Sequence, residues 1–232
     1  MSERRELGIV YVTGGASGLG AAVVAAVEKA GGTPAVIDRV APEDPAVAHA
    51  LADLADSAAA AAAVAELVEA VGPPSAVVTA AGTDACGPLA EVDTEVWERV
   101  VRVNLFGTAA VVRACLPHLE AVRGTVVTVA STLGLRPAGD ATAYCASKFG
   151  VVGFTRALAM ELAGRVGVTL LVPGGMRTHF FDGRTEQYKP GPDAALNDPG
   201  DVAQAVLTAL QMPIGCELRE LVVATSTEPS WP

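Results

Sequence analysis

A regular alternation between short apolar runs and longer helical runs constrains the fold more than any other feature of the sequence. The apolar runs are rich in Val and Ile, begin near residue 8 and recur as far as residue 225. Between them lie runs with apolar residues at helical spacing. This rhythm is typical of a parallel sheet with helices on both faces. We therefore predict an α/β fold, with a Rossmann-type doubly wound parallel seven-stranded sheet in a single domain over residues 1–232.

The alternation also gives the expected bounds of each element. The predicted strands are 8–14, 34–38, 47–52, 75–82, 124–131, 166–174 and 220–225. The predicted helices are 20–32, 56–72, 94–122, 142–164 and 199–210. Asp56 or Ser57 is the expected cap of the second helix. Residues 175–198 are rich in Gly, Pro and charge, and this composition predicts a loop.

Charge and cysteine usage narrow the possible partners. The formal net charge of −10 argues against nucleic-acid and anionic-membrane binding, because both need a basic surface. No apolar run approaches the roughly 20 residues of a membrane span or forms a signal peptide. The four cysteines and three histidines are scattered, which predicts no metal site and suits reduced thiols in a cytoplasmic protein.

A glycine-rich loop joins the first predicted strand to the first predicted helix. Residues 13–20 read TGGASGLG, which differs from the G-x-G-x-x-G spacing of the common dinucleotide fingerprint. Glycines allow a pyrophosphate to approach the backbone, and the helix amino terminus favours its charge. Asp38 ends the second strand, where a carboxylate can accept hydrogen bonds from an adenosine ribose. The loop as a simple turn, and Asp38 as a solvated carboxylate, remain alternatives.

Tyr144 and Lys148 lie one helical turn apart in the sequence YCASK. Residues four apart share a helix face, so the phenol and the ammonium can point into the same space. The alternative is an amphipathic helix with one aromatic residue and one solvated lysine. Cys145 falls on a different azimuth and is interpreted as a packing residue.

The glycine loop and the Tyr144–Lys148 pair, together with four further motifs, resemble the pattern of the short-chain dehydrogenase/reductase family. The motifs stand in family order over nearly the whole chain: Thr13 to Gly20, Thr79-Ala80-Ala81-Gly82, Asn104, Ser131, Tyr144 with Lys148, and Pro173-Gly174. The chain departs from the family at Thr79 and Ala80, which replace two asparagines that steady the central strand.

The resemblance implies a catalytic role for four residues. Tyr144 would exchange a proton with the substrate oxygen, and Lys148 would lower the phenol pKa and bond the nicotinamide ribose. Ser131 would polarise the substrate oxygen, although it could be an ordinary turn serine. Asn104 would hold a water in a proton relay, although it could be a surface asparagine.

The resemblance also implies a binding site for a nicotinamide dinucleotide. The expected cofactor residues are Gly14, Ser17, Gly18, Leu19, Gly20, Asp38, Asp53, Leu54, Ala81, Gly82, Tyr144, Lys148, Pro173, Gly174 and Thr178. Asp53 is nearly as compatible with a solvated acid near a helix cap. A carboxylate at Asp38 repels the phosphate of NADP, so NAD is favoured, while Arg39 leaves NADP possible.

Substrate choice is expected to lie in residues 175–198 and in the segment after Ser131. An apolar pocket could be lined by Phe180, Phe181, Tyr188, Leu133 and Leu135. The basic residues here are Arg136, Arg184 and Lys189. They could meet an anionic tail, as on an acyl thioester carrier, but solvated loop charges are the favoured interpretation.

We predict an NAD(P)-dependent oxidoreductase that interconverts a secondary alcohol and a ketone, with a small-molecule substrate. One alternative is an NADPH-dependent 3-oxoacyl thioester reductase, and another is a non-catalytic nucleotide-binding sensor or scaffold. Family members commonly assemble through the helices here predicted at 94–122 and 142–164 and through the last strand. We therefore expect a homotetramer, with a homodimer as the second choice.

Overall fold

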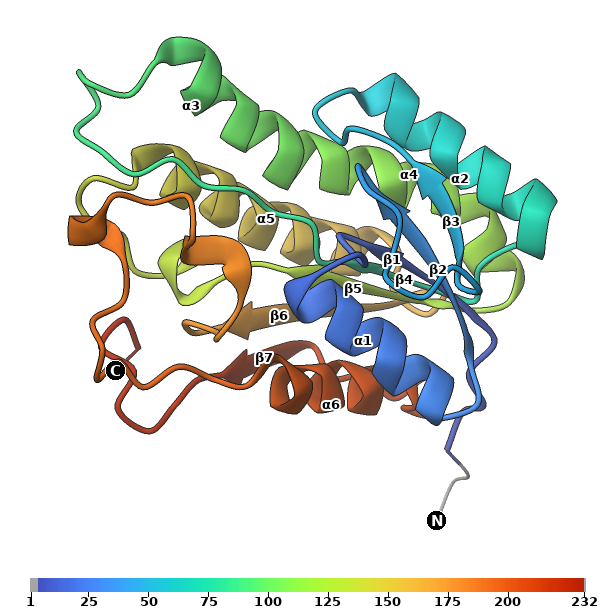
Figure 1. Ribbon diagram of the computed structural model, residues 1–232. Coiled ribbons are helices and arrows are strands. Elements are labelled where there is room, and N and C mark those ends of the chain that lie inside the picture. The colour runs from blue at the N-terminus through green and yellow to red at the C-terminus, as the bar shows by residue number, and fades with distance from the viewer. Residues whose placement is uncertain (1–3, 232) are drawn as a thin grey trace.

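Seven parallel strands form one sheet in the computed structural model, which describes residues 4–231 (Figure 1). The spatial order of the strands is β3-β2-β1-β4-β5-β6-β7. Their bounds are β1 Ile9–Thr13, β2 Thr33–Asp38, β3 Ala48–Leu51, β4 Ala76–Thr79, β5 Thr125–Val129, β6 Gly167–Pro173 and β7 Glu220–Val223. The predicted fold class and all seven predicted strands are confirmed, with bounds that differ by a few residues.

The strand order reverses direction at β1. The chain runs outward from β1 to β2 and β3, and then returns to pair β4 with the other side of β1. From β4 it proceeds outward again through β5 and β6 to β7. In such sheets, the crevice at the carboxyl ends of the strands beside the reversal is where ligands bind. The topology therefore locates the candidate site between the ends of β1 and β4.

Helices cover both faces of the sheet. Their bounds are α1 Gly18–Lys29, α2 Ser57–Val71, α3 Thr94–Val101, α4 Thr108–Ala121, α5 Thr142–Glu161 and α6 Pro199–Leu210. In Figure 1, α1 and α6 lie on one side of the sheet, and α2, α4 and α5 lie on the other. The helices bury two apolar clusters against the strands, one on each face.

Aspartates begin several of these helices. Asp56 caps α2 by accepting hydrogen bonds from the backbone N–H of Ala58 (2.8 Å) and Ala59 (3.2 Å). A carboxylate in this position satisfies N–H groups that the helix leaves unpaired and complements the positive end of the dipole. Of the two candidates for this cap, Asp56 is therefore correct.

The helix predicted over residues 94–122 is continuous but contains an irregularity. Residues Arg102–Gly107 form a π-helical segment between α3 and α4. Gly107 at its end packs so tightly on Leu54 that a Cβ there would lie 2.6 Å from the Leu54 carbonyl oxygen. Such segments are rare and are found mostly at functional sites. This one carries Asn104.

The same continuous helix, Thr94–Ala121, is long and apolar enough by composition to cross a membrane. In this fold it lies on the sheet, where the side chains of Val111, Val112, Cys115 and Leu119 are buried. A core helix of this length meets the same length and composition criteria as a membrane span. In this fold 39% of its most apolar stretch is buried.

Candidate active site

A cleft of about 570 Å³ opens at the carboxyl ends of the strands. It lies where the strand order reverses, as the topology requires. The cleft is lined by every predicted cofactor residue: Gly14, Ser17, Gly18, Leu19, Gly20, Asp38, Asp53, Leu54, Ala81, Gly82, Tyr144, Lys148, Pro173, Gly174 and Thr178. Ser131 also lines the cleft, whereas Asn104 lies behind its wall. The fold thus brings the predicted residues together from seven separate segments.

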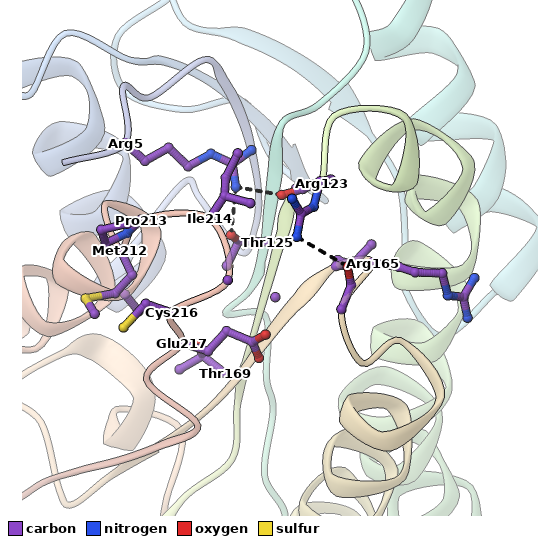
Figure 2. Close-up of a pocket in the computed structure, with 16 residues that line it drawn as sticks. Arg5, Arg123, Thr125, Arg165, Thr169, Met212, Pro213, Ile214, Cys216 and Glu217 are labelled. Atoms are coloured by element: carbon purple, nitrogen blue, oxygen red, sulfur yellow. Dashed lines mark hydrogen bonds between the residues drawn. The ribbon is translucent and has the colours of Figure 1, made fainter. Parts of the chain in front are cut away.

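A second cavity lies at the opposite, amino-terminal edge of the strands. Figure 2 shows Arg5 and Arg123 beside Thr125, the first residue of β5. Arg5 Nη1 donates hydrogen bonds to the Arg123 carbonyl oxygen (2.8 Å) and to Thr125 Oγ1 (3.4 Å). This cavity measures about 30 Å³, roughly the space of one water molecule. It is far too small for a dinucleotide or an organic substrate.

The glycine loop fits an anionic cofactor. Gly14 adopts φ +68°, and a Cβ there would lie 2.7 Å from the Ala81 Cα. A Cβ on Gly20 would collide with the Gly14 carbonyl. Only glycine permits this close approach of the loop to β4 and to the start of α1. Ser17 is the N-cap of α1 but makes no side-chain capping bond, so unpaired N–H groups at this helix end remain for phosphate oxygens.

Asp38 faces the glycine loop rather than open solvent. Its Oδ2 accepts a hydrogen bond from the Ala16 backbone N–H (3.1 Å), and its Oδ1 accepts one from the Arg39 N–H (2.6 Å). These bonds hold the carboxylate at the mouth of the cleft, where β2 ends. The carboxylate is therefore half-buried and anchored to the backbone, and its role toward a ribose stays a prediction.

Asp53 lies in the cleft wall and is held there by local contacts. It lines the cleft, yet its Oδ2 pairs with Arg99 Nη2 (2.8 Å) and its Oδ1 accepts the Ala55 N–H (3.0 Å). The backbone hydrogen bond from Ala55, followed by the Arg99 interaction, lowers the Asp53 pKa against the opposing effect of burial. Leu54 beside it is buried.

Tyr144, Lys148 and Ser131 meet in the cleft at the start of α5. Lys148 Nζ lies 5.6 Å from the centroid of the Tyr144 ring and donates a hydrogen bond to the Val129 carbonyl at the end of β5 (2.9 Å). Ser131 begins the short 3₁₀ turn Thr132–Gly134. This turn packs so closely on α5 that a Cβ on Gly134 would lie 2.9 Å from the Lys148 carbonyl oxygen. That contact positions Ser131 beside Tyr144.

Burial shifts the pKa values of this pair in opposite directions. Desolvation raises the pKa of Tyr144 to about 12, and a hydrogen bond with Ser131 opposes that rise. Desolvation lowers the pKa of Lys148 to about 8, while the Asp84 carboxylate acts in the other direction. Each shift favours the neutral form of its group. At pH 7 the phenol therefore retains its proton and Lys148 remains mostly charged.

Asn104 is buried, with 1 % of its surface exposed, so the alternative of a surface asparagine is wrong. Its Oδ1 accepts the Thr83 backbone N–H (2.8 Å), and its Nδ2 donates to the Thr83 carbonyl (2.9 Å) and to Ser147 Oγ (2.9 Å). The amide thus fastens the π-helical segment to the segment after β4 and to α5. Both N–H donors are used by protein groups, and the role in a water relay stays a prediction.

The two residues that depart from the family pattern have a visible consequence. Thr79 is buried at the end of β4, and its hydroxyl has no hydrogen-bond partner among residues 4–231. The strand end is nevertheless held, because the Ala81 N–H donates to Thr13 Oγ1 (3.1 Å). The link between β1 and β4 therefore does not depend on an asparagine.

Segment 175–198 forms one wall of the cleft and contains two short 3₁₀ turns, His179–Phe181 and Glu186–Tyr188. Phe180 and Phe181 line the cleft as predicted, and so does Leu133. Tyr188 and Leu135 do not: Tyr188 donates its hydroxyl to Asp140 Oδ2 (2.9 Å), and Leu135 packs against core residues.

The three basic residues of this region differ in their exposure and in their ion-pair partners. Arg136 is exposed, as expected for a solvated charge, and Lys189 pairs with Glu186. Arg184 is not a solvated charge, because its side chain is mostly buried and pairs with Asp84. The favoured interpretation of Arg184 is therefore wrong.

Several residues in or beside the cleft were not predicted from the sequence, and four of them make polar contacts there. Glu228 Oε2 accepts the Gly175 N–H (3.0 Å), and Ser230 donates to Thr132 Oγ1 (2.7 Å). Glu228, Ser230 and Thr132 line the cleft, and Asp84 lies behind Arg184. No motif marks these residues. For Glu228 and Ser230, the only hint in the sequence was a carboxylate and a hydroxyl close together near residue 230, in a stretch without any other motif.

Residues 4–231 contain no cluster of three or more His, Cys, Asp or Glu side chains placed to hold an ion. The four cysteines are unpaired, and Cys145 is buried beside the Ala138 carbonyl, as expected for a packing residue.

Comparisons with known proteins identify the family of this chain. A family model described as short chain dehydrogenase matches residues 8–189. The (2S)-[(R)-hydroxy(phenyl)methyl]succinyl-CoA dehydrogenase subunit BbsD of Thauera aromatica is 33% identical over 218 residues, which cover 86% of this chain and 87% of that protein. The 2-(S)-hydroxypropyl-CoM dehydrogenase 3 of Xanthobacter autotrophicus is 30% identical over 90% of this chain and 92% of its own.

Solved structures share the fold. An alcohol dehydrogenase from the archaeon Thermococcus sibiricus, complexed with 5-hydroxy-NADP, superposes with a TM-score of 0.84. The superposition covers 94% of this chain and 96% of that chain, at 21% sequence identity. At this identity the likeness concerns the fold alone.

Proposed function

The chain belongs to the short-chain dehydrogenase/reductase family of oxidoreductases, and from this premise we propose that it is an NAD-dependent enzyme that interconverts a secondary alcohol and a ketone. The observation that carries the proposal is the meeting of Tyr144, Lys148 and Ser131 in a cleft that also contains the glycine loop. Loss of any of the three would have favoured a non-catalytic nucleotide sensor.

Tyr144 is proposed to move the proton of the reaction. When bound, a nicotinamide dinucleotide would supply the hydride acceptor or donor. With a pKa of about 12, the Tyr144 phenol holds its proton at neutral pH and can give it to a ketone oxygen. In the oxidation direction a phenolate is needed, and a charged Lys148 5.6 Å from the ring centroid lowers the free energy of that anion.

Ser131 is proposed to hold the substrate oxygen beside Tyr144. Its oxygen accepts the Leu133 N–H (3.2 Å), and its O–H, which donates toward the Tyr144 oxygen, can donate to a substrate oxygen placed beside that phenol. A donor aimed at an oxygen that gains negative charge stabilises the transition state.

The preference for NAD rests on Asp38. Hydrogen bonds from the Ala16 and Arg39 N–H groups keep its carboxylate at the end of β2. A fixed anion there suits the hydroxyls of an adenosine ribose and repels the phosphate that NADP carries on it. Arg39 is exposed beside it, so its guanidinium is the group that would favour NADP.

Assembly and compartment belong to the same proposal. Exposed apolar side chains on α5 and the π-helical segment support a homotetramer over a monomer. Four unpaired cysteines support a reducing compartment, the cytoplasm.

The test is a panel of secondary alcohols, ketones and a 3-oxoacyl thioester, assayed with both cofactors by nicotinamide absorbance. Tyr144→Phe should bind the cofactor as wild type does and lose turnover by roughly 10² to 10⁴-fold, the usual worth of general acid–base help. Tyr188→Phe is the matched control, since its hydroxyl bonds Asp140 outside the cleft lining, and it should retain most turnover.

Two outcomes would redirect the proposal. Near wild-type turnover in Tyr144→Phe would refute the role of Tyr144 as the general acid and base. Tight cofactor binding with no turnover on any panel member would favour the sensor or scaffold, and turnover of the thioester alone with NADPH would favour the 3-oxoacyl reductase.

A further inference from the structure

Arg184 makes an enclosed ion pair at the substrate side of the cleft. Its Nη2 donates to Asp84 Oδ2, and the two side chains are only 18% and 5% exposed. Asp84 follows β4 by five residues, whereas Arg184 lies in segment 175–198. The pair therefore joins the cleft wall after β4 to the segment that faces it. Most other ion pairs of the described chain are far more exposed.

The remaining contacts of Arg184 organise its own segment. The guanidinium carbon lies 4.6 Å from the centroid of the Phe181 ring and 5.4 Å from that of Phe180. Arg184 Nη1 donates to the Tyr188 carbonyl (3.1 Å). A planar guanidinium can stack on aromatic rings and pair with a carboxylate at the same time, which an ammonium does poorly.

Phe180 connects Arg184 to Tyr144, the side chain proposed to transfer the proton. Its ring centroid is 5.7 Å from that of Tyr144, at a tilted angle of 58°. The chain of contacts therefore runs from Asp84 through Arg184 and Phe180 to Tyr144. The ion pair is thus connected to the phenol ring through the Phe180 ring.

Asp84 neutralises the charge that Arg184 brings to the cleft wall. Asp84 Oδ2 also accepts the Cys86 thiol (3.2 Å), and its Oδ1 accepts the Ala85 N–H (2.7 Å). Arg184 Nε is buried and has no partner within residues 4–231. A guanidinium already paired with a carboxylate has little attraction left for a substrate anion.

We propose that Arg184, fixed by Asp84, is a positioning residue that holds Phe180 against Tyr144 and, with its charge neutralised by Asp84, adds no net charge to the substrate pocket, so that the pocket accepts uncharged alcohols and ketones rather than carboxylic acids. The substrate part of this inference rests on the proposed function. The positioning part concerns the protein alone and is tested without a substrate.

Hydrogen exchange of the cofactor-free protein tests the positioning. Arg184→Met and Asp84→Asn should each speed amide exchange in segment 175–198, and the double variant should add little to either, because both remove the same contact. Lys189→Met is the matched control, since it removes a charge of the same segment whose partner Glu186 is exposed. It should exchange as wild type does. Unchanged exchange in both single variants, with unfolding midpoints near that of wild type, would overturn the proposal.

Titration of Tyr144 separates positioning from a merely structural role. The Asp84 carboxylate raises the Tyr144 pKa, and the Arg184 guanidinium lowers it. Asp84→Asn should therefore lower the pKa of the phenol, and Arg184→Met should raise it. The measurement is tyrosinate absorbance after a rapid pH jump, as the difference between each protein and its Tyr144→Phe counterpart. Shifts of the same sign, or none, would contradict the contact chain.

Paired substrates test the charge of the pocket. Ethyl 3-oxobutanoate and 3-oxobutanoate share a skeleton and differ in charge, and the wild type should favour the ester in kcat/KM by at least tenfold. Asp84→Asn frees the charge of Arg184, so it should narrow this ratio chiefly through KM of the acid. A wild type that favours the acid would overturn the substrate assignment. Failure of both compounds and of the whole panel would count against the proposed function, while exchange and titration still decide the role of Arg184.

Discussion

Lys148 is a buried cation, with 4% of its surface exposed. The Val129 carbonyl accepts one of its protons at 2.9 Å, and desolvation lowers its pKa to about 8. In the unfolded chain the pKa of a lysine returns to its ordinary value, so folding and protonation are linked. The buried Lys148 ammonium thus lowers the stability of the fold at neutral pH.

This linkage predicts a pH-dependent difference between wild type and Lys148→Met. Below pH 8 the folded wild type holds a buried charge that the variant lacks, so the variant should be the more stable of the two. Between pH 8 and about 10.5 the folded state has lost the proton that the unfolded chain still binds, so stability of the wild type should rise relative to the variant. Urea unfolding of both proteins across this range is the measurement. An advantage of the variant that stays constant or grows with pH would contradict the assignment.

Asp38 should control the choice of cofactor. Asp38→Ala is expected to weaken binding of NADH by about tenfold to a hundredfold, because a hydrogen bond to a charged group is worth about 1.5–3 kcal/mol. The same change should improve binding of NADPH. Asp44→Ala is the matched control, since Asp44 likewise accepts a loop N–H (2.8 Å) but lies outside the cleft lining. Fluorescence titration with NADH and NADPH measures both affinities. Tighter binding of NADPH than of NADH by the wild type would show that Arg39 influences cofactor choice more than Asp38 does.

Residues with a sequence motif were predictable, and residues without one were not. Ser131, Tyr144 and Lys148 meet in the cleft as expected, because motif spacing and helix geometry fix them locally. The partnership of Asp84 with Arg184 spans 100 positions and depends on how segment 175–198 folds over the cleft. No local pattern encodes such a contact.

The π-helical segment Arg102–Gly107 is the element whose geometry departs most from expectation. One extra residue in a turn shifts the helix face on either side of it, because each α-helical residue turns by about 100°. Here the shift turns the Asn104 amide toward Thr83 and Ser147. The segment therefore joins three pieces of the cleft wall.

Removal of this connection should be costly. Asn104→Ala would leave the Thr83 N–H and carbonyl without their partner in a buried place, at about 1–3 kcal/mol for each unsatisfied group. We expect a loss of about 2–4 kcal/mol in the free energy of unfolding. Asn197→Ala, which removes one half-buried hydrogen bond to the Gly175 carbonyl (3.0 Å), should lose about 0.5–1.5 kcal/mol. Equal losses in the two variants, measured in urea, would contradict this role.

The spacing of apolar residues predicted which segments are strands and which are helices, but it did not predict the π-helical segment. The alternation predicted each strand and helix, since buried parallel strands and amphipathic helices differ strongly in pattern. One additional residue inside a long helix barely alters the apolar spacing of its neighbours. The two 3₁₀ turns of segment 175–198 were missed for a related reason, because three-residue turns have no period to detect.

At the scale of the whole molecule, the sheet and its helices leave some large apolar side chains in contact with solvent. Phe106 in the π-helical segment and Phe149 in α5 are 53% and 43% exposed, and these two elements pack side by side. Figure 1 shows α3, α4 and α5 along one side of the sheet. Exposed apolar patches often mark interfaces, and aromatic residues are enriched in them.

We predict a homotetramer that uses this face, with a homodimer as the second choice. Phe106→Glu combined with Phe149→Glu should reduce the assembly to smaller species, because charges would be buried without partners. Leu51→Glu is the control, since Leu51 is 61% exposed but lies on β3 at the far edge of the sheet. Light scattering at micromolar concentration measures both. A wild-type mass of 23.4 kDa, that of one chain, would refute the prediction.

The cleft draws on residues from Gly14 to Ser230, and this span has a consequence during protein synthesis. Ribosomes add about 5–20 residues per second, so roughly ten to forty seconds separate the emergence of the glycine loop from that of Glu228 and Ser230. Helix α1 packs against α6, which is also made late. Until then, the apolar face of α1 is uncovered on the nascent chain. The protein should therefore depend on chaperones in proportion to how slowly it is translated.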